Sequence, residues 1–399
     1  MTFPRGLRAL DHADFRLFFG AQLISLVGSW MQTVAQSWLV LQLADSAFKL
    51  GLIGTLQMAP VLLFSIVSGV VADRLPKRRL LVATQAALGL QALALGGLVS
   101  AGHVRYWHIA VLAELMGFAN VLDMPARQSY VLDLVGKADL VNAVALNSAA
   151  FNAARIVGPA VAGLLIARFG VVPAFLINSV GFVLVIVALL ALDAEGRPGP
   201  RGAGTMVAEI AAGIGYALRT AQMRLILGLL FAVSLCVFNF TVYVPLLAKN
   251  VLGVGAEGFG FLMAALGVGA VAGALSVASF RNPPLSGMFL AAFVACAGLT
   301  AMSVVRHVPV AVALLFVIGF SGLVLVASCN TALQLIAPDA LRGRVMSLYS
   351  LIWGGVFPIG SFMVGSISEV WGVSRAFLVM GTIALSALIA LSTWWRVRA

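Results

Sequence analysis

The chain has 399 residues and a formal net charge of +11, and its composition is 62% hydrophobic but only 10% charged. Its mean hydropathy is +1.07. A soluble protein of this length needs far more polar surface to stay in solution. The composition therefore excludes a soluble globular protein and indicates a protein embedded in a membrane.

Apolar stretches long enough to cross a bilayer follow one another along the chain. A spanning helix needs roughly 20 apolar residues for a hydrocarbon core of about 30 Å. The first stretch begins after the polar, basic sequence MTFPRGLRALDHADFR, so we expect no cleaved signal peptide. We expect an all-α membrane protein with twelve spans: Phe15–Leu43, Lys49–Ala72, Leu80–Ala101, Trp107–Pro125, Asn142–Ala167, Pro173–Leu192, Met223–Ala248, Gly258–Phe280, Leu285–Val304, Pro309–Ala332, Arg344–Ser368 and Ser374–Trp395.

The positive charges between these spans alternate in density. Of the 25 Lys and Arg residues, 18 fall on one side of the membrane, six on the other, and Arg155 lies within a span. Because cytoplasmic loops carry the excess of Lys and Arg, we expect both termini in the cytoplasm and the chain in the cytoplasmic (inner) membrane. The net charge then reflects topology, and we expect no nucleic-acid partner.

The two ends of the chain resemble each other. At an offset of 202 residues, Phe169-Gly170-Val171 matches Trp371-Gly372-Val373, and Gly158 matches Gly360. We expect an N-terminal six-helix half at residues 1–193, a cytoplasmic linker at 194–222 and a C-terminal six-helix half at 223–399. The linker contains an amphipathic helix on the membrane surface or a plain connecting helix. Such a parallel repeat places a binding site between the halves, near the midplane.

The loop after the second span carries a signature. It runs Gly69-Val-Val-Ala-Asp73-Arg74-Leu-Pro76-Lys77-Arg78-Arg79 and resembles the G-x-L-a-D-r-x-G-r-k loop of the major facilitator superfamily, with Val71 and Pro76 as departures. The small Gly69 permits close helix approach, and Asp73 lies where it can pair with a cation. The resemblance implies a conformational latch formed by Gly69, Asp73, Arg74, Lys77, Arg78 and Arg127. The alternative is an ordinary loop held inside by its positive charge.

The fifth span contains Gly158-Pro159 followed by Gly163. This resembles the G-P-x-x-x-G element in the fifth helix of drug/proton antiporters of the same superfamily. Pro159 removes a backbone donor, and the two glycines allow close packing, so a bendable helix is expected. The alternative is a role in packing alone.

A further resemblance covers nearly the whole chain. It rests on Asp123-Met-Pro125-Ala-Arg127-Gln128, on Asn142-Ala-Val-Ala-Leu-Asn147 and on Asn152-Ala-Ala-Arg155, which look like the enterobactin-exporter-like branch, also described as transmembrane secretion effectors. The resemblance implies proton-coupled efflux of a small molecule, a siderophore or an amphipathic drug, by alternating access. Its partners would be that substrate, protons and membrane lipid, and we expect a monomer.

Ionisable side chains inside spans are costly, at roughly 2.5–3.5 kcal/mol or more near the bilayer centre, and therefore point to function. Glu114 and Arg155 lie well inside, and Asp123 lies near the cytoplasmic end of the fourth span. We predict that these three residues couple protons or substrate, with Glu114 desolvated and Arg155 placed to pair with either carboxylate. The alternative is a static ion pair joining helices four and five. Asp123 and Arg127 form an i, i+4 pair near the latch.

Polar residues also recur at helical spacing through the first span. The superfamily resemblance implies that helices one, four, seven and ten line a cavity, and interhelical hydrogen bonding is the alternative. The predicted lining residues are Gln22, Ser25, Ser29, Gln32, Gln36, Ser234, Phe238, Thr241, Ser321, Ser328 and Thr331.

Several kinds of chemistry have no sequence support. The chain has no G-x-x-x-x-G-K-[ST] loop for ATP coupling. Cys236, Cys296 and Cys329 lie within apolar spans, and no Ser/His/Asp, Cys/His or metal-ligand spacing is present, so we expect neither an enzyme nor a bound metal or cofactor. Two alternatives remain open: a lysophospholipid or lipid flippase, and a non-transporting membrane sensor or assembly factor on the same fold.

Overall fold

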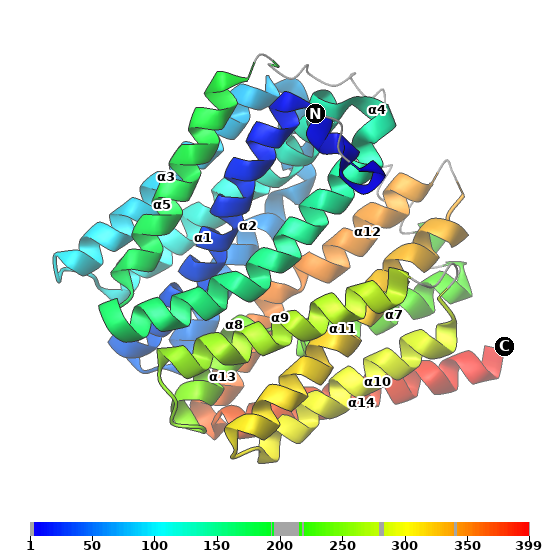
Figure 1. The fold of residues 1–399 in the computed structure, drawn as a ribbon. Coiled ribbons are helices and arrows are strands. Elements are labelled where there is room, and N and C mark those ends of the chain that lie inside the picture. Colours follow the sequence, from blue (N-terminus) through cyan, green and yellow to red (C-terminus); the bar gives the residue numbers. More distant parts are fainter. Residues whose placement is uncertain are drawn as a thin grey trace. The chain divides into compact units, whose positions relative to one another are not determined.

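The computed structural model describes residues 4–192, 194, 215–217, 219–278, 283–338 and 341–398, and of residues 5, 6, 65–67, 69, 70, 72, 73, 278 and 398 it describes the backbone alone. Over these residues every regular element is a helix (Figure 1). The linker sequence EGRPGPRGAG and most of the predicted amphipathic helix lie outside the described residues.

The helices follow the predicted apolar stretches, because a helix satisfies its backbone groups internally where lipid offers no partners. Within the described residues, eleven helical segments are long and apolar enough to cross a bilayer. The all-α membrane fold is thus confirmed. The elements are η1 (Arg5–Asp11), α1 (Ala13–Ala44), α2 (Ala47–Arg74), α3 (Lys77–Ser100), α4 (Tyr106–Phe169), α5 (Val172–Ala191), α7 (Ala221–Cys236), α8 (Phe240–Asn250), α9 (Ala256–Ala278), α10 (Leu285–Ala301), η2 (Met302–Val304), α11 (Val308–Ile336), α12 (Arg342–Gly355), α13 (Phe357–Trp371) and α14 (Val373–Arg398).

The helix α4 contains both the fourth and the fifth predicted span. Its 64 residues include one with non-helical geometry, Gly136, at φ 71° and ψ 177°. At about 1.5 Å per residue, such a run is about three times as long as a bilayer core is thick. Gly136 accepts the positive φ because it has no Cβ. The two predicted spans are therefore joined through this residue without a separate loop.

Two predicted spans are interrupted in the structure. The seventh is divided into α7 and α8 at Asn239, and the eleventh into α12 and α13 at Val356. Pro358 lies in the first turn of α13, where its missing N–H costs nothing because that donor has no partner within the helix. The Asn239 side chain donates to the carbonyl of Leu235 at 2.8 Å and accepts from the Ser361 hydroxyl at 3.2 Å. Side-chain hydrogen bonding at the break therefore links α7 to α13.

The described contacts divide the chain into two compact units. Unit 1 comprises Met1–Ala44 and Ala59–Gly202, and unit 2 comprises Asp45–Met58 and Ala203–Ala399. The first half of α2 therefore belongs to unit 2 and its second half to unit 1. The halves expected from the sequence, divided near residue 193, remain a prediction.

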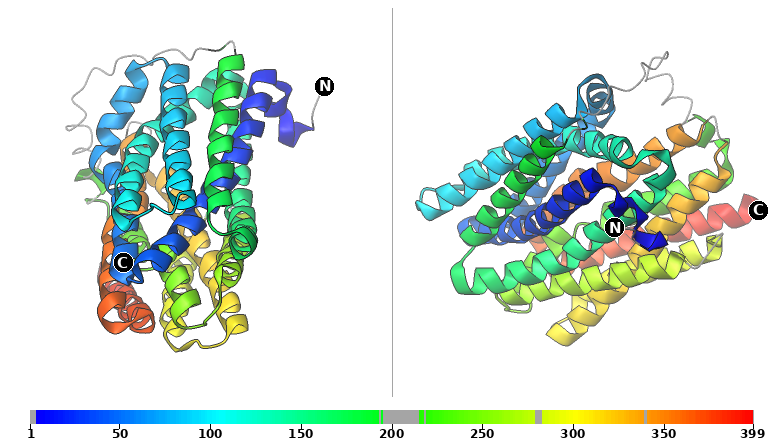
Figure 2. Two further views of the ribbon diagram at one scale, coloured as in Figure 1. Left: turned by 90° about the vertical axis from the view of Figure 1, so that its left-hand side faces the viewer. Right: turned by 45° about the horizontal axis from the view of Figure 1, so that its top comes forward.

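In unit 1, α1 packs against α4 and α5, and α3 packs against α4 and α5 (Figure 2). Gly158 of α4 lies directly on α1, since a Cβ there would come within 2.5 Å of the Trp30 Cβ and 2.9 Å of the Val27 carbonyl oxygen. A buried cluster that includes Phe15, Phe18 and Tyr130 joins the start of α1 to the middle of α4. Small and aromatic side chains together determine how closely these helices approach.

In unit 2, glycines bring helix backbones into contact. A Cβ at Gly269 or Gly273 of α9 would collide with the backbone of α11, and a Cβ at Gly319 of α11 would collide with that of α9. The first half of α2 packs in the same way, because a Cβ at Gly51 would lie 2.5 Å from the Ser361 carbonyl oxygen of α13. Small residues at helix interfaces permit this approach where the hydrophobic effect between helices is weak.

The internal repeat is visible in the backbone. Gly170 ends α4 with φ 74°, and Gly372 ends α13 with φ 80°. These glycines stand at matching positions of the sequence repeat, and each turns the chain into the following helix, α5 or α14. Positive φ favours glycine at both positions.

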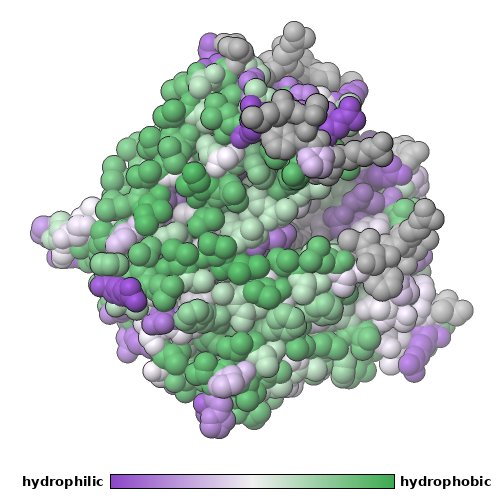
Figure 3. Space-filling view, in the orientation of Figure 1, coloured by the Kyte–Doolittle hydropathy of each residue, from purple (hydrophilic) through white to green (hydrophobic). Residues whose placement is uncertain are grey.

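The face of the helices shown in Figure 3 is largely apolar. Large hydrophobic side chains such as Leu90, Val187, Leu275 and Leu290 are exposed. Such a surface needs a lipid environment.

Candidate functional site

Asp123 is a buried carboxylate with hydrogen-bond donors on both oxygens. It is 1% exposed in α4. Its Oδ1 accepts from the Thr84 hydroxyl at 2.8 Å and from the Gln85 amide at 2.7 Å, both on α3. Its Oδ2 pairs with Arg127 one turn further along α4, so the predicted i, i+4 pair is present. Three donors offset the cost of burying the charge and join α3 to α4.

Glu114 has no such partners. Its side chain is exposed, and no hydrogen bond or ion pair reaches it from the described residues. The expected burial of this carboxylate by protein is not seen, because Ala113 and Gly117 occupy the interior side of α4. Glu114 instead shares a face with Leu115 and Phe118, both exposed. A single carboxylate therefore stands on an apolar face of a spanning segment.

Arg155, on the later part of α4, is also unpaired. Its Nε is buried and finds no hydrogen-bond partner in the described structure. It pairs with neither Glu114 nor Asp123, contrary to the expected ion pair. The partners of Asp123 are instead Thr84, Gln85 and Arg127. The static pair offered as the structural alternative for helices four and five is thus absent from the part of the chain that the structure describes.

The polar stripe of the first span is mostly buried. Gln22, Ser25, Gln32 and Gln36 are each less than 5% exposed, and Ser29 is half-buried. The Gln32 amide donates to Gln91 Oε1 of α3 at 2.9 Å, and the Asn178 amide of α5 donates to Gln32 Oε1 at 2.7 Å. The Ser29 hydroxyl donates to Asn178 Oδ1 at 3.3 Å.

These bonds match the interhelical alternative for Gln32 and Ser29. Gln22 and Gln36 differ, because Gln22 Oε1 and both side-chain polar atoms of Gln36 are buried without a partner in the described structure. Buried polar atoms normally find a partner, so these two amides call for water or a ligand.

Among the predicted lining residues of unit 2, some also have hydrogen-bond partners and one does not. Ser321 and Thr331 donate to carbonyls of their own helix α11, at 2.7 Å to Val317 and 3.0 Å to Ala327. Ser328 is buried and Thr241 is half-buried. Phe238 lies in the break between α7 and α8 and packs on Gly322 of α11. Ser234 is fully buried, and its hydroxyl has no partner among the described groups.

Two of the basic residues that follow α2, Lys77 and Arg78, make contacts within unit 1. Lys77 is buried and pairs with Asp133 of α4 at 2.8 Å. Arg78 donates to the carbonyl of Leu190 at the end of α5 at 2.8 Å. Arg74 is exposed. The side chains of Gly69 and Asp73 lie outside the described residues, so the latch remains a prediction.

The glycine–proline element lies where α4 meets α1. Gly158 touches the α1 backbone, and Pro159 and Gly163 are buried inside the helix. The close packing predicted for Gly158 is therefore present. One turn before Arg155, Phe151 makes an edge contact with Trp30 at 5.8 Å between ring centroids.

Four partners in this region were not singled out from the sequence: Thr84, Gln85, Gln91 and Asn178. All are polar residues inside apolar stretches. The polarity that drew attention to the first span also marks these positions. Their pairing depends on which faces of α3 and α5 turn inward, and a single stretch does not reveal that.

Residues 5–399 match the family described as transmembrane secretion effector. The chain belongs to this family, a branch of the major facilitator superfamily. Its members are membrane transporters, and this chain is a multi-pass membrane protein.

Relatives of this transmembrane secretion effector cover almost its full length. The chain is 25% identical to the staphyloferrin A transporter of Staphylococcus aureus, over 92% of each chain. It is 28% identical to the multidrug efflux pump Tap of Mycobacterium tuberculosis, over 94% of this chain and 92% of the pump. It is 26% identical to the enterobactin exporter EntS of Escherichia coli, over 95% of this chain and 93% of the exporter.

Solved structures share the fold. The nucleoside transporter NupG superimposes with a TM-score of 0.76 at 10% identity, over 96% of this chain and 99% of that one. A POT family transporter in complex with 5-aminolevulinic acid gives a TM-score of 0.76 at 12% identity, over 95% of both chains. These similarities establish the transporter fold.

Proposed function

We propose that this protein exports a small amphipathic molecule, a siderophore or a drug, across the cytoplasmic membrane, in exchange for protons and by alternating access. The relatives named as an efflux pump and an exporter support this direction. Together with the staphyloferrin A transporter they support this class of cargo, and each match covers more than nine-tenths of the chain. The observation that carries the proposal is the unpartnered carboxylate of Glu114 on an apolar face of a spanning helix.

Antiport needs a group that takes a proton on one side and releases it on the other. Glu114 suits this role because no donor in the described structure holds its carboxylate in one state. Asp123 suits it less well, because protonation would disturb bonds from Thr84, Gln85 and Arg127. Arg155 supplies a positive charge that pairs with Glu114 or with a substrate during the transport cycle.

The ligand contacts those predicted lining residues whose buried polar atoms have no hydrogen-bond partner in the described structure. Gln22, Gln36 and Ser234 are buried and carry side-chain oxygen or nitrogen atoms without partners in the described part of the chain. A bound cargo or its water shell would satisfy them. The remaining lining residues supply shape and the aromatic surface of Phe238.

The orientation rests on the charge bias of the loops, which supports cytoplasmic termini. A reporter enzyme that works only in the cytoplasm should be active when it is fused after Ala399, and one that works only in the periplasm should be inactive there. Activity of a periplasm-dependent reporter at that position would contradict the orientation.

The test of coupling uses everted membrane vesicles and a fluorescent amphipathic dye. We expect Glu114→Gln to abolish uptake driven by a pH gradient while dye binding persists. Glu257→Gln is the matched control, because Glu257 is an exposed carboxylate in the first turn of α9. Transport by Glu114→Gln with the wild-type pH dependence would overturn the role of Glu114, and Asp123→Asn would then be examined in the same assay.

A further inference from the structure

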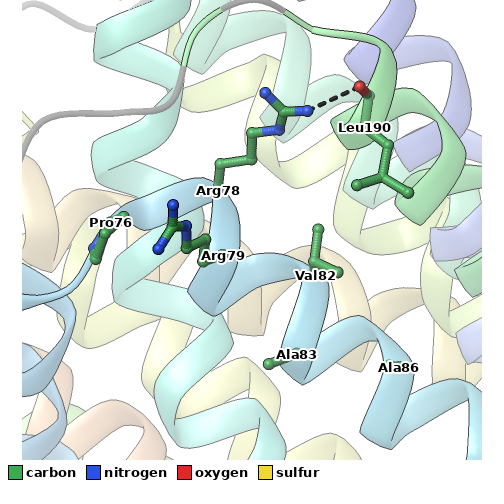
Figure 4. A pocket seen from close by; sticks show the side chains of 7 residues that line it. All are labelled: Pro76, Arg78, Arg79, Val82, Ala83, Ala86 and Leu190. Atoms are coloured by element: carbon green, nitrogen blue, oxygen red, sulfur yellow. Dashed lines mark hydrogen bonds between the residues drawn. The ribbon is translucent and has the colours of Figure 1, made fainter.

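A groove of about 390 Å³ opens at the start of α3. Its walls come from six residues at the start of α3 and from Leu190 at the end of α5 (Figure 4). The six are Pro76, Arg78, Arg79, Val82, Ala83 and Ala86. Every lining residue belongs to unit 1. The groove is distinct from Glu114, Asp123 and Arg155, none of which lines it.

Two guanidinium groups lie at one end of the groove. Arg78 donates to the Leu190 carbonyl at 2.8 Å, which places a positive charge at the C-terminal end of α5, where the helix dipole is negative. Arg79 is exposed and makes no hydrogen bond or ion pair with any residue that the structure describes. Among the described residues that line the groove, Arg78 and Arg79 are the charged ones and none is a carboxylate, so the charge of this described lining is positive.

The other end of the groove is apolar. It is formed by Val82, Ala83 and Ala86 of α3, and the small side chains of the two alanines leave the space open. Leu190 is 59% exposed, and beyond it Leu90 of α3 and Val187 of α5 are 66% and 57% exposed. Large apolar side chains left uncovered on spanning helices contact lipid. The groove therefore runs from a basic edge onto a lipid-facing surface.

We propose that this groove binds one anionic phospholipid from the leaflet on the basic side of the membrane. The phosphate lies against the free guanidinium of Arg79, with the Arg78 charge beside it, and an acyl chain lies along Val82, Ala83 and Ala86. Guanidinium groups match phosphate oxygens in geometry as well as charge. A zwitterionic lipid is disfavoured, because none of the described lining residues offers a carboxylate for its ammonium group. Basic pockets between spanning helices favour anionic headgroups for these reasons.

The experiment uses the purified full chain in detergent and native mass spectrometry, with phosphatidylglycerol and phosphatidylcholine of identical acyl chains. We expect wild type to retain phosphatidylglycerol at least about five-fold better. Arg79→Gln should bring the two lipids to about equal retention. Ala83→Leu, which fills the groove and leaves its charge unchanged, should lower phosphatidylglycerol retention to a similar extent.

Two control variants should behave as wild type. Arg219→Gln removes an exposed arginine elsewhere, and Ala94→Leu enlarges an exposed alanine of α3 outside the groove. Inorganic phosphate at millimolar concentration should not displace the lipid, because it makes no contact with the apolar wall. Equal retention of both lipids by wild type would overturn the proposal. Unchanged selectivity in Arg79→Gln, unchanged phosphatidylglycerol retention in Ala83→Leu, or displacement of the lipid by free phosphate would overturn it as well.

Discussion

The carboxylate of Glu369 accepts a hydrogen bond from the backbone N–H of Phe48, with 3.0 Å between the two heavy atoms. The same oxygen accepts from the Ser46 hydroxyl at 3.0 Å. Glu369 is in α13, and Phe48 is in the first turn of α2, where backbone donors have no helical partner. A carboxylate from another helix thus caps α2 and holds the segment Asp45–Met58 within unit 2.

Removing this cap should loosen the start of α2. Helix caps contribute about 1 kcal/mol, which corresponds to about a five-fold change in an equilibrium. We expect Glu369→Ala to raise the maleimide labelling rate of a Thr55→Cys reporter by about that factor, since Thr55 bonds to the Pro358 carbonyl at 3.0 Å. Glu369→Gln keeps an acceptor oxygen and should label like wild type. Equal rates in Glu369→Ala and wild type would show that the cap does not hold the segment.

Gly51 should not tolerate a side chain. A Cβ there would lie 2.5 Å from the Ser361 carbonyl oxygen and 2.8 Å from the Gly365 Cα. Overpacking of this kind costs about 1–3 kcal/mol. We expect Gly51→Ala to lower the thermal unfolding midpoint in detergent by several degrees. Gly97→Ala is the control, because no atom lies within 4 Å of a Cβ at that position. If both variants melt alike, the contact between α2 and α13 is not tight.

Gln32→Leu separates packing from cargo binding. The substitution removes the bonds to Gln91 and Asn178 and leaves two buried amides without these partners. We expect a stability loss of about 1–2 kcal/mol with little change in dye affinity. Gln22→Leu removes an oxygen that has no partner in the described structure, so stability should hold while dye affinity falls. The reverse pattern would make Gln32 the residue that contacts cargo. Thermal melts and fluorescence titration measure the two quantities.

Asp73→Asn should slow export without preventing membrane insertion. A latch of about 1–3 kcal/mol shifts a two-state population by about 5- to 150-fold. Dye efflux from whole cells, normalised to protein in the membrane fraction, measures the effect. Asp14→Asn removes a carboxylate on the same predicted side and should leave efflux unchanged. Normal efflux by well-inserted Asp73→Asn would remove the latch from the mechanism.

The groove at Arg78 and Arg79 and the Glu114 site make separate predictions. Lipid selectivity is measured on the solubilised chain and needs no transport. Proton coupling is measured in vesicles and needs no particular lipid at the groove. A failure of one therefore leaves the other standing.

Much of the fold could be predicted from the chain without its structure. The bilayer sets a minimum length for an apolar helix, so α3, α5 and α11 lie close to the predicted stretches. The match of Phe169-Gly170 to Trp371-Gly372 indicated an internal repeat, and both glycines have positive φ. The i, i+4 spacing of Asp123 and Arg127 predicted a pair that is present. Each of these follows from local chemistry or from the thickness of the membrane.

The partners of the buried polar groups were decided only by the tertiary structure. Gln85 meets Asp123, and Asn178 meets Gln32, across separate helices. The breaks at Asn239 and Val356, the assignment of Asp45–Met58 to unit 2 and the unpaired state of Arg155 were likewise not apparent from sequence. The reason is physical. Apolar stretches specify that a helix spans, but the rotation of each helix depends on the shapes of its neighbours, and that rotation decides which polar groups pair and which are left free.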